Sequence, residues 1–247
     1  MKHLFYSLSF LLLVLSCGSN KVATYSAKTY SINDTLVSND LDTIINPYKT
    51  EMEQKMNKVI GHSNYDLEKY TPESPLGNFV ADVVFKRGFE YKFNQKGFNI
   101  QKNNTFCMLN FGGLRTTVNK GDITIGSIYE LMPFDNEIVI VKLTPQHIND
   151  LLLYLFAKNG QPISNAIAYI NSSKGKLDIG GQPYNFKDDV YVITSDYLAN
   201  GGDKMTFFKG QPYVKTGVLI RDALINYVSE VKELPNFKVE GRIQQIR

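Results

Sequence analysis

Residues 137–142 read Glu-Ile-Val-Ile-Val-Lys, and the four consecutive β-branched side chains favour an extended strand. Three other runs, at residues 105–110, 166–171 and 190–194, have the same strand character. Helices are predicted between these runs, but some intervals between strands are too short for a crossover helix. We therefore expect an α+β fold, a single domain in which helices pack on a mixed β-sheet.

Four helices are predicted from apolar residues that recur every three or four positions. The first begins near Asp40 and ends at Gly61. The second and third begin at Ser74-Pro75 and Thr144-Pro145, because a hydroxyl can cap free N–H groups and proline fits the first turn of a helix. Residues 218–231 are predicted to form the fourth helix.

The first seventeen residues have the pattern of a secretory signal, with a basic start, an apolar run at residues 4–15 and Ser16 before Cys17. The apolar run of about a dozen residues is shorter than the roughly 20 that a membrane-spanning helix needs. Residues 14–17 resemble the lipobox of bacterial lipoproteins, which implies a diacylglyceryl group on Cys17. An ordinary signal peptide that happens to contain a cysteine is the alternative.

This interpretation divides the chain into a signal peptide (residues 1–17), a flexible tether (18–39) and a folded domain (40–247). The tether is predicted from its Ser, Asn, Thr and Lys content. We expect the protein to be anchored by lipid to a bacterial membrane in the cell envelope, facing the periplasm. The formal net charge is only +3 and the sequence shows no Lys/Arg stripe, so nucleic acid is not expected as a partner.

Residues 110–115 read Asn-Phe-Gly-Gly-Leu-Arg and follow a predicted strand directly. Gly112 and Gly113 allow a sharp turn that brings backbone N–H groups near a ligand. Arg115 adds a planar, permanently charged guanidinium that suits phosphate or carboxylate. By itself, however, a Gly-Gly pair after a strand is more often only a turn.

Two aromatic residues and an acid lie in later connecting segments. Phe134 follows a proline and could be a fixed platform on which a flat base stacks, although this motif taken alone favours a residue that fills the edge of the core. Tyr197 supplies a second ring, and the Asp203 carboxylate can accept two hydrogen bonds from a vicinal diol such as a ribose. Taken alone, Gly-Gly-Asp is more often a tight loop than a binding site.

Together these segments resemble the C-terminal, substrate-binding domain of the 5′-nucleotidase and UDP-sugar hydrolase family. The resemblance runs from about residue 40 to the C-terminus and rests on five segments in order. They are Leu76-Gly77-Asn78, residues 110–115, Gly121-Asp122-Ile123-Thr124, residues 133–136 and Asn200-Gly201-Gly202-Asp203. It implies the fold of that domain and a role in binding nucleotides, nucleosides or nucleotide sugars.

The resemblance also implies a role for each matching side chain. Phe134 and Tyr197 would sandwich the base, Asp203 would hold the ribose hydroxyls, and Arg115 would contact the ribose-phosphate part. Asn110 matches a residue at the base edge, Gly112 and Gly113 match the turn, and Asn136 matches the last residue of Pro-Phe-Gly-Asn. There are departures: residues 72–75 replace a basic residue that reaches the ligand in many relatives, and Phe111 and Asp135 replace glycines.

Family members that hydrolyse phosphate esters use two metal ions held by a separate N-terminal domain rich in His and Asp. This chain has only His3, His62 and His147, so we expect no metal site, no cofactor and no catalytic residue in it. Both later histidines are interpreted as surface or capping residues. Cys107 lies in an apolar strand, which favours a small core residue over a nucleophile.

The sequence therefore supports three hypotheses. The first is a nucleotide- or nucleoside-binding protein of nucleotide catabolism that meets a separately encoded metallophosphoesterase, which would carry the divalent metal pair. The second is a non-catalytic scaffold or uptake-accessory lipoprotein that has lost its ligand. The third is direct hydrolysis by this chain, which metal-dependent phosphate release would establish.

Overall fold

The computed structural model describes residues 29, 39–91 and 98–246. The predicted signal peptide, Cys17 and all of the predicted tether except residues 29 and 39 lie outside the described residues, so these remain predictions. The chain divides into two units, one up to Asn46 and one from Pro47 to Arg247. Helix α2 (Asn39–Met56) begins in the first unit and ends in the second.

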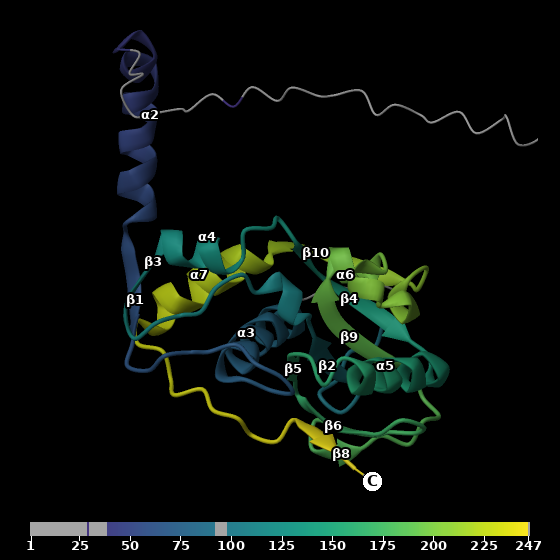
Figure 1. Ribbon diagram of the computed structural model, residues 1–247. Helices are drawn as coiled ribbons and strands as arrows, with labels where there is room; N and C mark the ends of the chain where they lie inside the picture. The colour runs from purple at the N-terminus through teal and green to yellow at the C-terminus, as the bar shows by residue number, and fades with distance from the viewer. Residues whose placement is uncertain (1–28, 30–38, 92–97, 247) are drawn as a thin grey trace, which may run out of the picture. The chain divides into compact units, whose positions relative to one another are not determined.

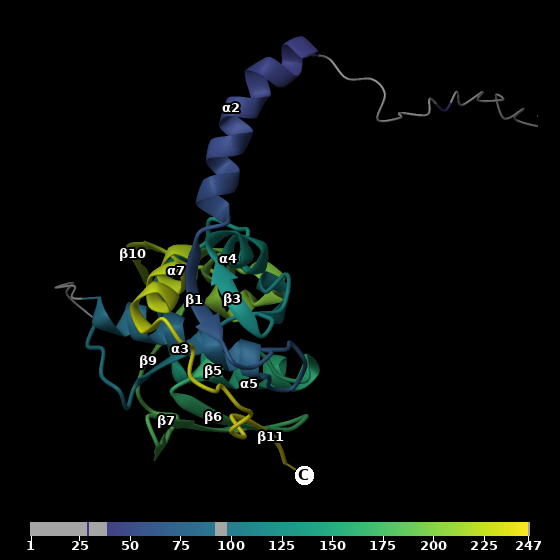
Figure 2. The same cartoon turned by 90° about the vertical axis from the view of Figure 1, so that its left-hand side faces the viewer.

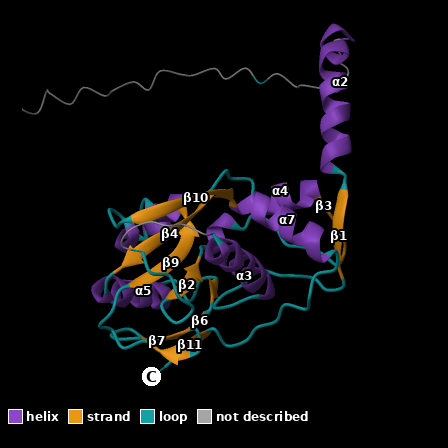
Figure 3. Cartoon of the chain, turned by 180° about the vertical axis from the view of Figure 1, so that it is seen from behind, coloured by secondary structure: helices purple, strands orange, loops and turns teal. Residues whose placement is uncertain are grey.

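A five-stranded sheet forms the centre of this unit, in the order β10-β4-β9-β2-β5. Its strands are β2 (Thr105–Met108), β4 (Glu137–Leu143), β5 (Ile163–Ser164), β9 (Val190–Ser195) and β10 (Tyr213–Leu219). Strands β2 and β9 run parallel, whereas the other neighbours run antiparallel. The predicted mixed sheet is therefore confirmed, and Figure 3 shows its strands in orange between the helices.

Two smaller sheets accompany the central one. Strands β1 (Val59–Ser63) and β3 (Gly121–Thr124) pair antiparallel, close to α7 (Figure 2). The other sheet has the order β11-β6-β7-β8. Its strands are β6 (Ala166–Ile170), β7 (Lys176–Ile179), β8 (Gln182–Pro183) and β11 (Ile243–Gln245). The strand predicted at residues 166–171 thus belongs to this four-stranded sheet rather than to the central one.

Both faces of the central sheet are buried, which explains why residues 138–141 of β4 are all apolar. Because successive side chains point to opposite faces, Ile138 and Ile140 join one hydrophobic cluster and Val139 and Val141 join the other. Helices α3 (Pro75–Glu90), α4 (Ile125–Leu131) and α7 (Ile220–Val231) belong to the first cluster. Helix α5 (Pro145–Ala157) and the four-stranded sheet complete the second (Figure 1).

Two helices begin where the sequence predicts. The Ser74 hydroxyl accepts a hydrogen bond from Gly77 N over 3.1 Å and so caps α3. Thr144 precedes α5 but does not cap it with its side chain, because its Oγ1 lies 2.9 Å from Nδ1 of His147 instead. Helix α7 begins two residues later than predicted, since residues 218 and 219 complete β10.

The prediction of one helix up to Gly61 is wrong at its end. Helix α2 ends at Met56, and Ile60 is buried in β1. A Cβ atom on Gly61 would lie 2.6 Å from Cγ1 of Val228, so β1 passes α7 at a distance that only glycine allows. The apolar side chains of α2 are exposed at Ile44, Ile45, Tyr48 and Met52. Within the part of the chain that the structure describes, no helix is long and apolar enough to cross a membrane.

Candidate functional site

Three segments that are distant in the sequence meet at one edge of the central sheet. Strands β2 and β9 are parallel, so the segments that follow Met108 and Ser195 leave from the same edge. Strand β4 is antiparallel to β9, and Ile138 lies opposite Ser195, so the segment that precedes β4 arrives there as well. The topology of the sheet therefore brings the three sequence motifs together.

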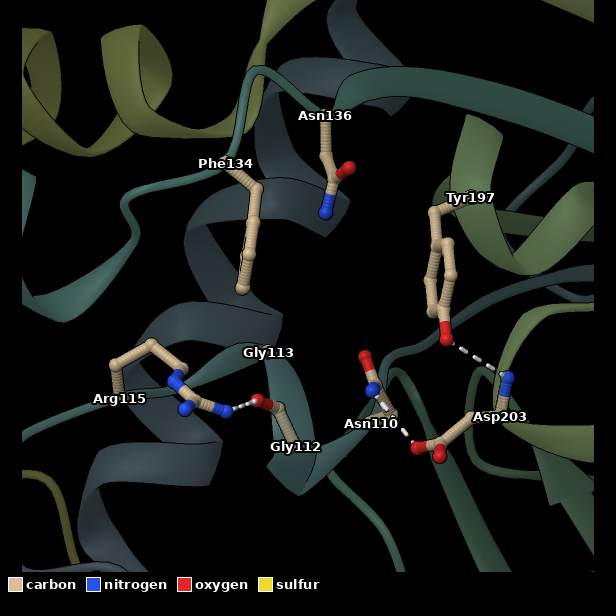
Figure 4. Close-up of a pocket in the computed structure, with 8 residues that line it drawn as sticks. All are labelled: Asn110, Gly112, Gly113, Arg115, Phe134, Asn136, Tyr197 and Asp203. Carbon is tan, nitrogen blue, oxygen red and sulfur yellow. Dashed lines mark hydrogen bonds between the residues drawn. The ribbon is translucent and has the colours of Figure 1, made fainter. Parts of the chain in front are cut away.

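A cavity of about 310 Å³ lies between these segments. Its walls are Asn110, Gly112, Gly113, Arg115, Phe134, Asn136, Tyr197 and Asp203, drawn in Figure 4. These are the eight residues that sequence analysis selected for substrate binding. The structure therefore gathers all of them around one space.

The two aromatic rings face each other across the cavity (Figure 4). Phe134 comes from the loop before β4 and is 44% exposed, and Tyr197 comes from the short helix α6 (Asp196–Ala199) and is 49% exposed. Neither ring is filling the core, which answers the alternative left open for Phe134. Two half-exposed rings with space between them can take a flat apolar group from both sides.

Tyr197 is held in place through its hydroxyl and by close contact along one side of its ring. Its hydroxyl accepts a hydrogen bond from Asp203 N over 3.1 Å. Its ring lies so close to Gly202 that a Cβ atom there would be 2.5 Å from both Cε1 and Cζ. Gly202 is therefore needed for this orientation of Tyr197, because real Cβ contacts do not come this close.

Asp203 has a left-handed backbone, with φ of 54° and ψ of 24°, in the 3-10 helix η2 (Gly202–Lys204). Its Oδ2 accepts a hydrogen bond from Asn110 Nδ2 over 2.8 Å, and its carbonyl oxygen accepts one from the Tyr154 hydroxyl over 3.0 Å. No donor among the described residues reaches Oδ1, which leaves that oxygen available to a ligand. Burial, then Asp203 and Tyr197, raises the pKa of Tyr154 to about 12, so this hydroxyl stays protonated and donates.

The two glycines after β2 make room for Asn110. A Cβ atom on Gly112 would lie 3.1 Å from Nδ2 of Asn110, and one on Gly113 would lie 3.1 Å from its Oδ1. The turn itself is the 3-10 helix η1 (Phe111–Gly113). It is fixed from outside by buried Gln161, whose Oε1 accepts from Phe111 N over 2.8 Å.

Arg115 is exposed and connects two of the three segments. Its Nη1 donates to Gly112 O over 3.3 Å, and its guanidinium carbon lies 6.0 Å from the centre of the Phe134 ring. The remaining N–H groups have no partner among the described residues. Asn136 completes the wall: its side-chain amide points into the cavity, while its carbonyl accepts from Ile220 N over 2.9 Å.

The Leu76-Gly77-Asn78 motif and the residues before it do not line the cavity. Asn78 is buried and donates to Glu73 Oε1 over 2.6 Å and to Lys238 O over 2.8 Å. The Glu73 carboxylate also accepts from Glu240 N and Arg242 N. Residues 72–75, where many relatives place a cation, therefore supply a glutamate that binds the C-terminal segment of this chain.

The other side chains that could bind a metal or act as nucleophiles make structural contacts instead. No group of His, Cys, Asp and Glu within residues 39–91 and 98–246 is arranged to hold a metal ion. His62 pairs with Asp122 at 3.0 Å, and His147 lies between Thr144 and Gln211. Cys107 is fully buried, as expected of a small core residue, and burial, then the Asp82 carboxylate, raises the pKa of its thiol well above its ordinary value.

The sequence profile of the 5′-nucleotidase C-terminal domain family matches residues 57–210, which include the whole cavity. The chain belongs to this family. It is 26% identical over 231 residues to the trifunctional nucleotide phosphoesterase protein YfkN of Bacillus subtilis. That alignment covers 82% of this chain and 15% of YfkN. It is also 26% identical over 202 residues to protein UshA of Escherichia coli, with 78% of this chain and 34% of that protein covered.

Solved structures show the same fold for this 5′-nucleotidase C-terminal domain. The 5′-nucleotidase precursor of Thermus thermophilus superposes with a TM-score of 0.67 at 23% identity, over 83% of this chain and 43% of that one. The NAD nucleotidase of Haemophilus influenzae gives a TM-score of 0.62 at 15% identity, over 85% and 42%. The chain thus spans less than half the length of these relatives.

Proposed function

We propose that the cavity binds a nucleoside or nucleotide, with the base between Phe134 and Tyr197. In this arrangement the ribose hydroxyls donate to Asp203, and Arg115 meets the ribose-phosphate part. Asn110 and Asn136 offer amide donors and acceptors to the edge of the base.

The observation that carries this proposal is the pair of half-exposed rings facing one cavity, with Asp203 bonded to one of them. Stacking of a base on an aromatic side chain contributes about 1–3 kcal/mol by alanine substitution, and it tolerates any base. Because Asn110 occupies Oδ2 of Asp203, the ribose would bind at Oδ1. The cavity thus offers a flat apolar slot next to one oriented acceptor.

The charges of the cavity favour a lightly charged ligand. Among the described residues that line it, only Arg115 and Asp203 are charged, one of each sign. Residues 72–75, where a second cation is common in the family, contain no basic residue and include the buried acid Glu73. We therefore expect nucleosides and monophosphates to bind this cavity better than triphosphates, whose charge it cannot balance.

We also propose that the chain is the recognition part of a nucleotide-catabolic hydrolase whose divalent metal pair is held by a separate metallophosphoesterase. Two observations support this. The described residues offer no cluster that fits a metal pair, and the longer relatives are named as a nucleotide phosphoesterase and an NAD nucleotidase. Phosphate release is then expected only when such a partner is added.

The sequence of residues 1–17 supports a further part of the proposal, a lipid anchor on Cys17 that holds the protein in the cell envelope. Mass spectrometry of the protein expressed from its full sequence in a bacterium should find a diacylglyceryl group on Cys17. Cys17→Ala should abolish that modification and release the protein from the membrane fraction. A protein that keeps an unmodified Cys17 would contradict the anchor.

Isothermal titration with adenosine and AMP tests the binding function. Phe134→Ala and Asp203→Asn should each weaken binding at least about tenfold, given the strength of base stacking and of hydrogen bonds to charged groups. Tyr70→Ala and Asp150→Asn are matched controls, because both side chains are exposed and neither lines the cavity. If no nucleotide, nucleoside or nucleotide sugar bound even with the partner enzyme present, the scaffold hypothesis would replace this one.

A further inference from the structure

Arg221, in the first turn of α7, is a buried charge that lies behind the cavity rather than in its wall. The residue is only 7% exposed, and a charge is rarely buried to this extent unless it is paired. Its Nη1 donates to Pro133 O over 3.2 Å and its Nη2 pairs with the Asp135 carboxylate. Its guanidinium also stacks over the ring of Tyr129, 4.2 Å from the ring centre.

These contacts lie on both sides of Phe134. The carbonyl of the preceding residue and the side chain of the following residue are bound to one planar guanidinium. A connecting loop without such ties is usually mobile, whereas a planar fork that makes several directed bonds fixes the backbone between them. The loop on both sides of Phe134 is therefore bound to a residue about 90 positions further along the chain, as the separations of 88 and 86 residues show.

We propose that Arg221 is a positioning residue that holds Phe134 toward the cavity and so determines the affinity for a flat ligand. The proposal rests on the binding function above and adds a part that no cavity-lining residue supplies. Asp135 supports it from the sequence side: it replaces a glycine of the family pattern, and its carboxylate is the partner of Arg221. The ion pair between Arg221 and Asp135 thus gives a structural reason for an aspartate where the family motif has glycine.

A fluorescent reporter tests the positioning without any ligand. The chain contains no tryptophan, so Phe134→Trp introduces a single indole at the position in question. Its fluorescence anisotropy should be high in the otherwise unchanged protein and should fall when Arg221→Gln or Asp135→Ala is added, because the loop gains rapid motion. Arg87→Gln is the matched control, since Arg87 pairs with Glu230 of the same helix α7 but does not contact the loop. Unchanged anisotropy in both loop variants would overturn the proposal.

A double-mutant cycle with adenosine then connects positioning to binding. Arg221→Gln should weaken binding about tenfold when Phe134 is present and should have little further effect in a Phe134→Leu background, because the two residues act through one another. Equal effects in both backgrounds would show that Arg221 acts only on general stability and would contradict the proposal. Should Arg221→Gln fail to fold, Asp135→Ala gives the same cycle from the exposed end of the pair, whose side chain is 76% exposed. If the unmodified protein binds no adenosine, the binding function fails, while the anisotropy result still decides the positioning.

Discussion

Asn110 and Asp203 are 93 positions apart in the sequence, yet the Asn110 amide donates a 2.8 Å hydrogen bond to Oδ2 of Asp203. This contact joins the turn after β2 to the segment after β9 and leaves Oδ1 as the available oxygen. It orients the carboxylate proposed to bind ribose.

The first prediction concerns that contact. Asn110→Asp removes the donor and brings two carboxylates together, which raises the pKa of one of them. Adenosine binding should therefore be weakened about tenfold near pH 8 and should partly recover toward pH 5. Titration calorimetry at both pH values measures this. Asn149→Asp, at a half-buried residue of α5 that does not line the cavity, should change neither value, and a pH-independent loss in Asn110→Asp would argue against carboxylate repulsion.

The second prediction concerns Gly202, over which the Tyr197 ring lies. Gly202→Ala places a methyl group 2.5 Å from ring carbons, so the ring must move and base stacking should weaken about tenfold. Gly181→Ala is the contrast: its Cβ would meet nothing within 4 Å, but its φ of +77° is strained for alanine. That variant should lower the free energy of unfolding by roughly 1 kcal/mol and leave binding intact. Normal binding by Gly202→Ala would remove Tyr197 from the proposed site.

The third prediction follows from the raised pKa of Tyr154. The hydroxyl titrates near the ordinary value of 10 in the unfolded chain and at about 12 in the folded one, so the folded state binds more protons between these values. The stability that this group contributes is fully present below pH 10 and is lost as the pH rises through about 12. Urea unfolding from pH 9 upward should show a stability difference between the unmodified protein and Tyr154→Phe that shrinks toward pH 12. A difference that stays constant over this range would contradict the assignment.

The fourth prediction concerns Glu73, which is 4% exposed and holds the C-terminal segment. Glu73→Ala removes the acceptor of two backbone N–H groups and one of the two acceptors of the Asn78 amide. We expect the free energy of unfolding to fall by about 2–4 kcal/mol, measured by urea denaturation. Glu68→Ala, whose side chain is exposed, should change it by less than about 0.5 kcal/mol. Equal effects would mean that burial of Glu73 contributes little.

The residues of the cavity wall could be selected from the sequence because each lies inside a short motif, and the motifs in their order resemble one family. The β-branched side chains predicted β4 and the Ser74-Pro75 pair predicted the start of α3 for a similar reason, since both signals depend on side chains within a few positions. Predicting which segments meet also requires the topology of the sheet. Only the parallel pairing of β2 and β9, with β4 antiparallel to β9, places the three segments at one edge.

The supporting residues had no local signal. Gln161, Tyr154 and Arg221 reach the site through contacts 49 to 89 positions away, and nothing in their own neighbourhoods marks them. The prediction of where the first helix ends was wrong for the same reason. The spacing of Met56 and Ile60 suits a helix, but pairing of β1 with β3 and the close approach of Gly61 to Val228 turn that segment into a strand.

Every wall of the cavity is rooted in a single sheet edge inside the unit from Pro47 to Arg247. Its shape is consequently self-contained, and no neighbouring module has to assemble it. Such a unit can be joined to different neighbouring domains during evolution while its cavity keeps the same shape. The alignments have this modular pattern, since 78–82% of this chain corresponds to only 15–34% of two much longer relatives.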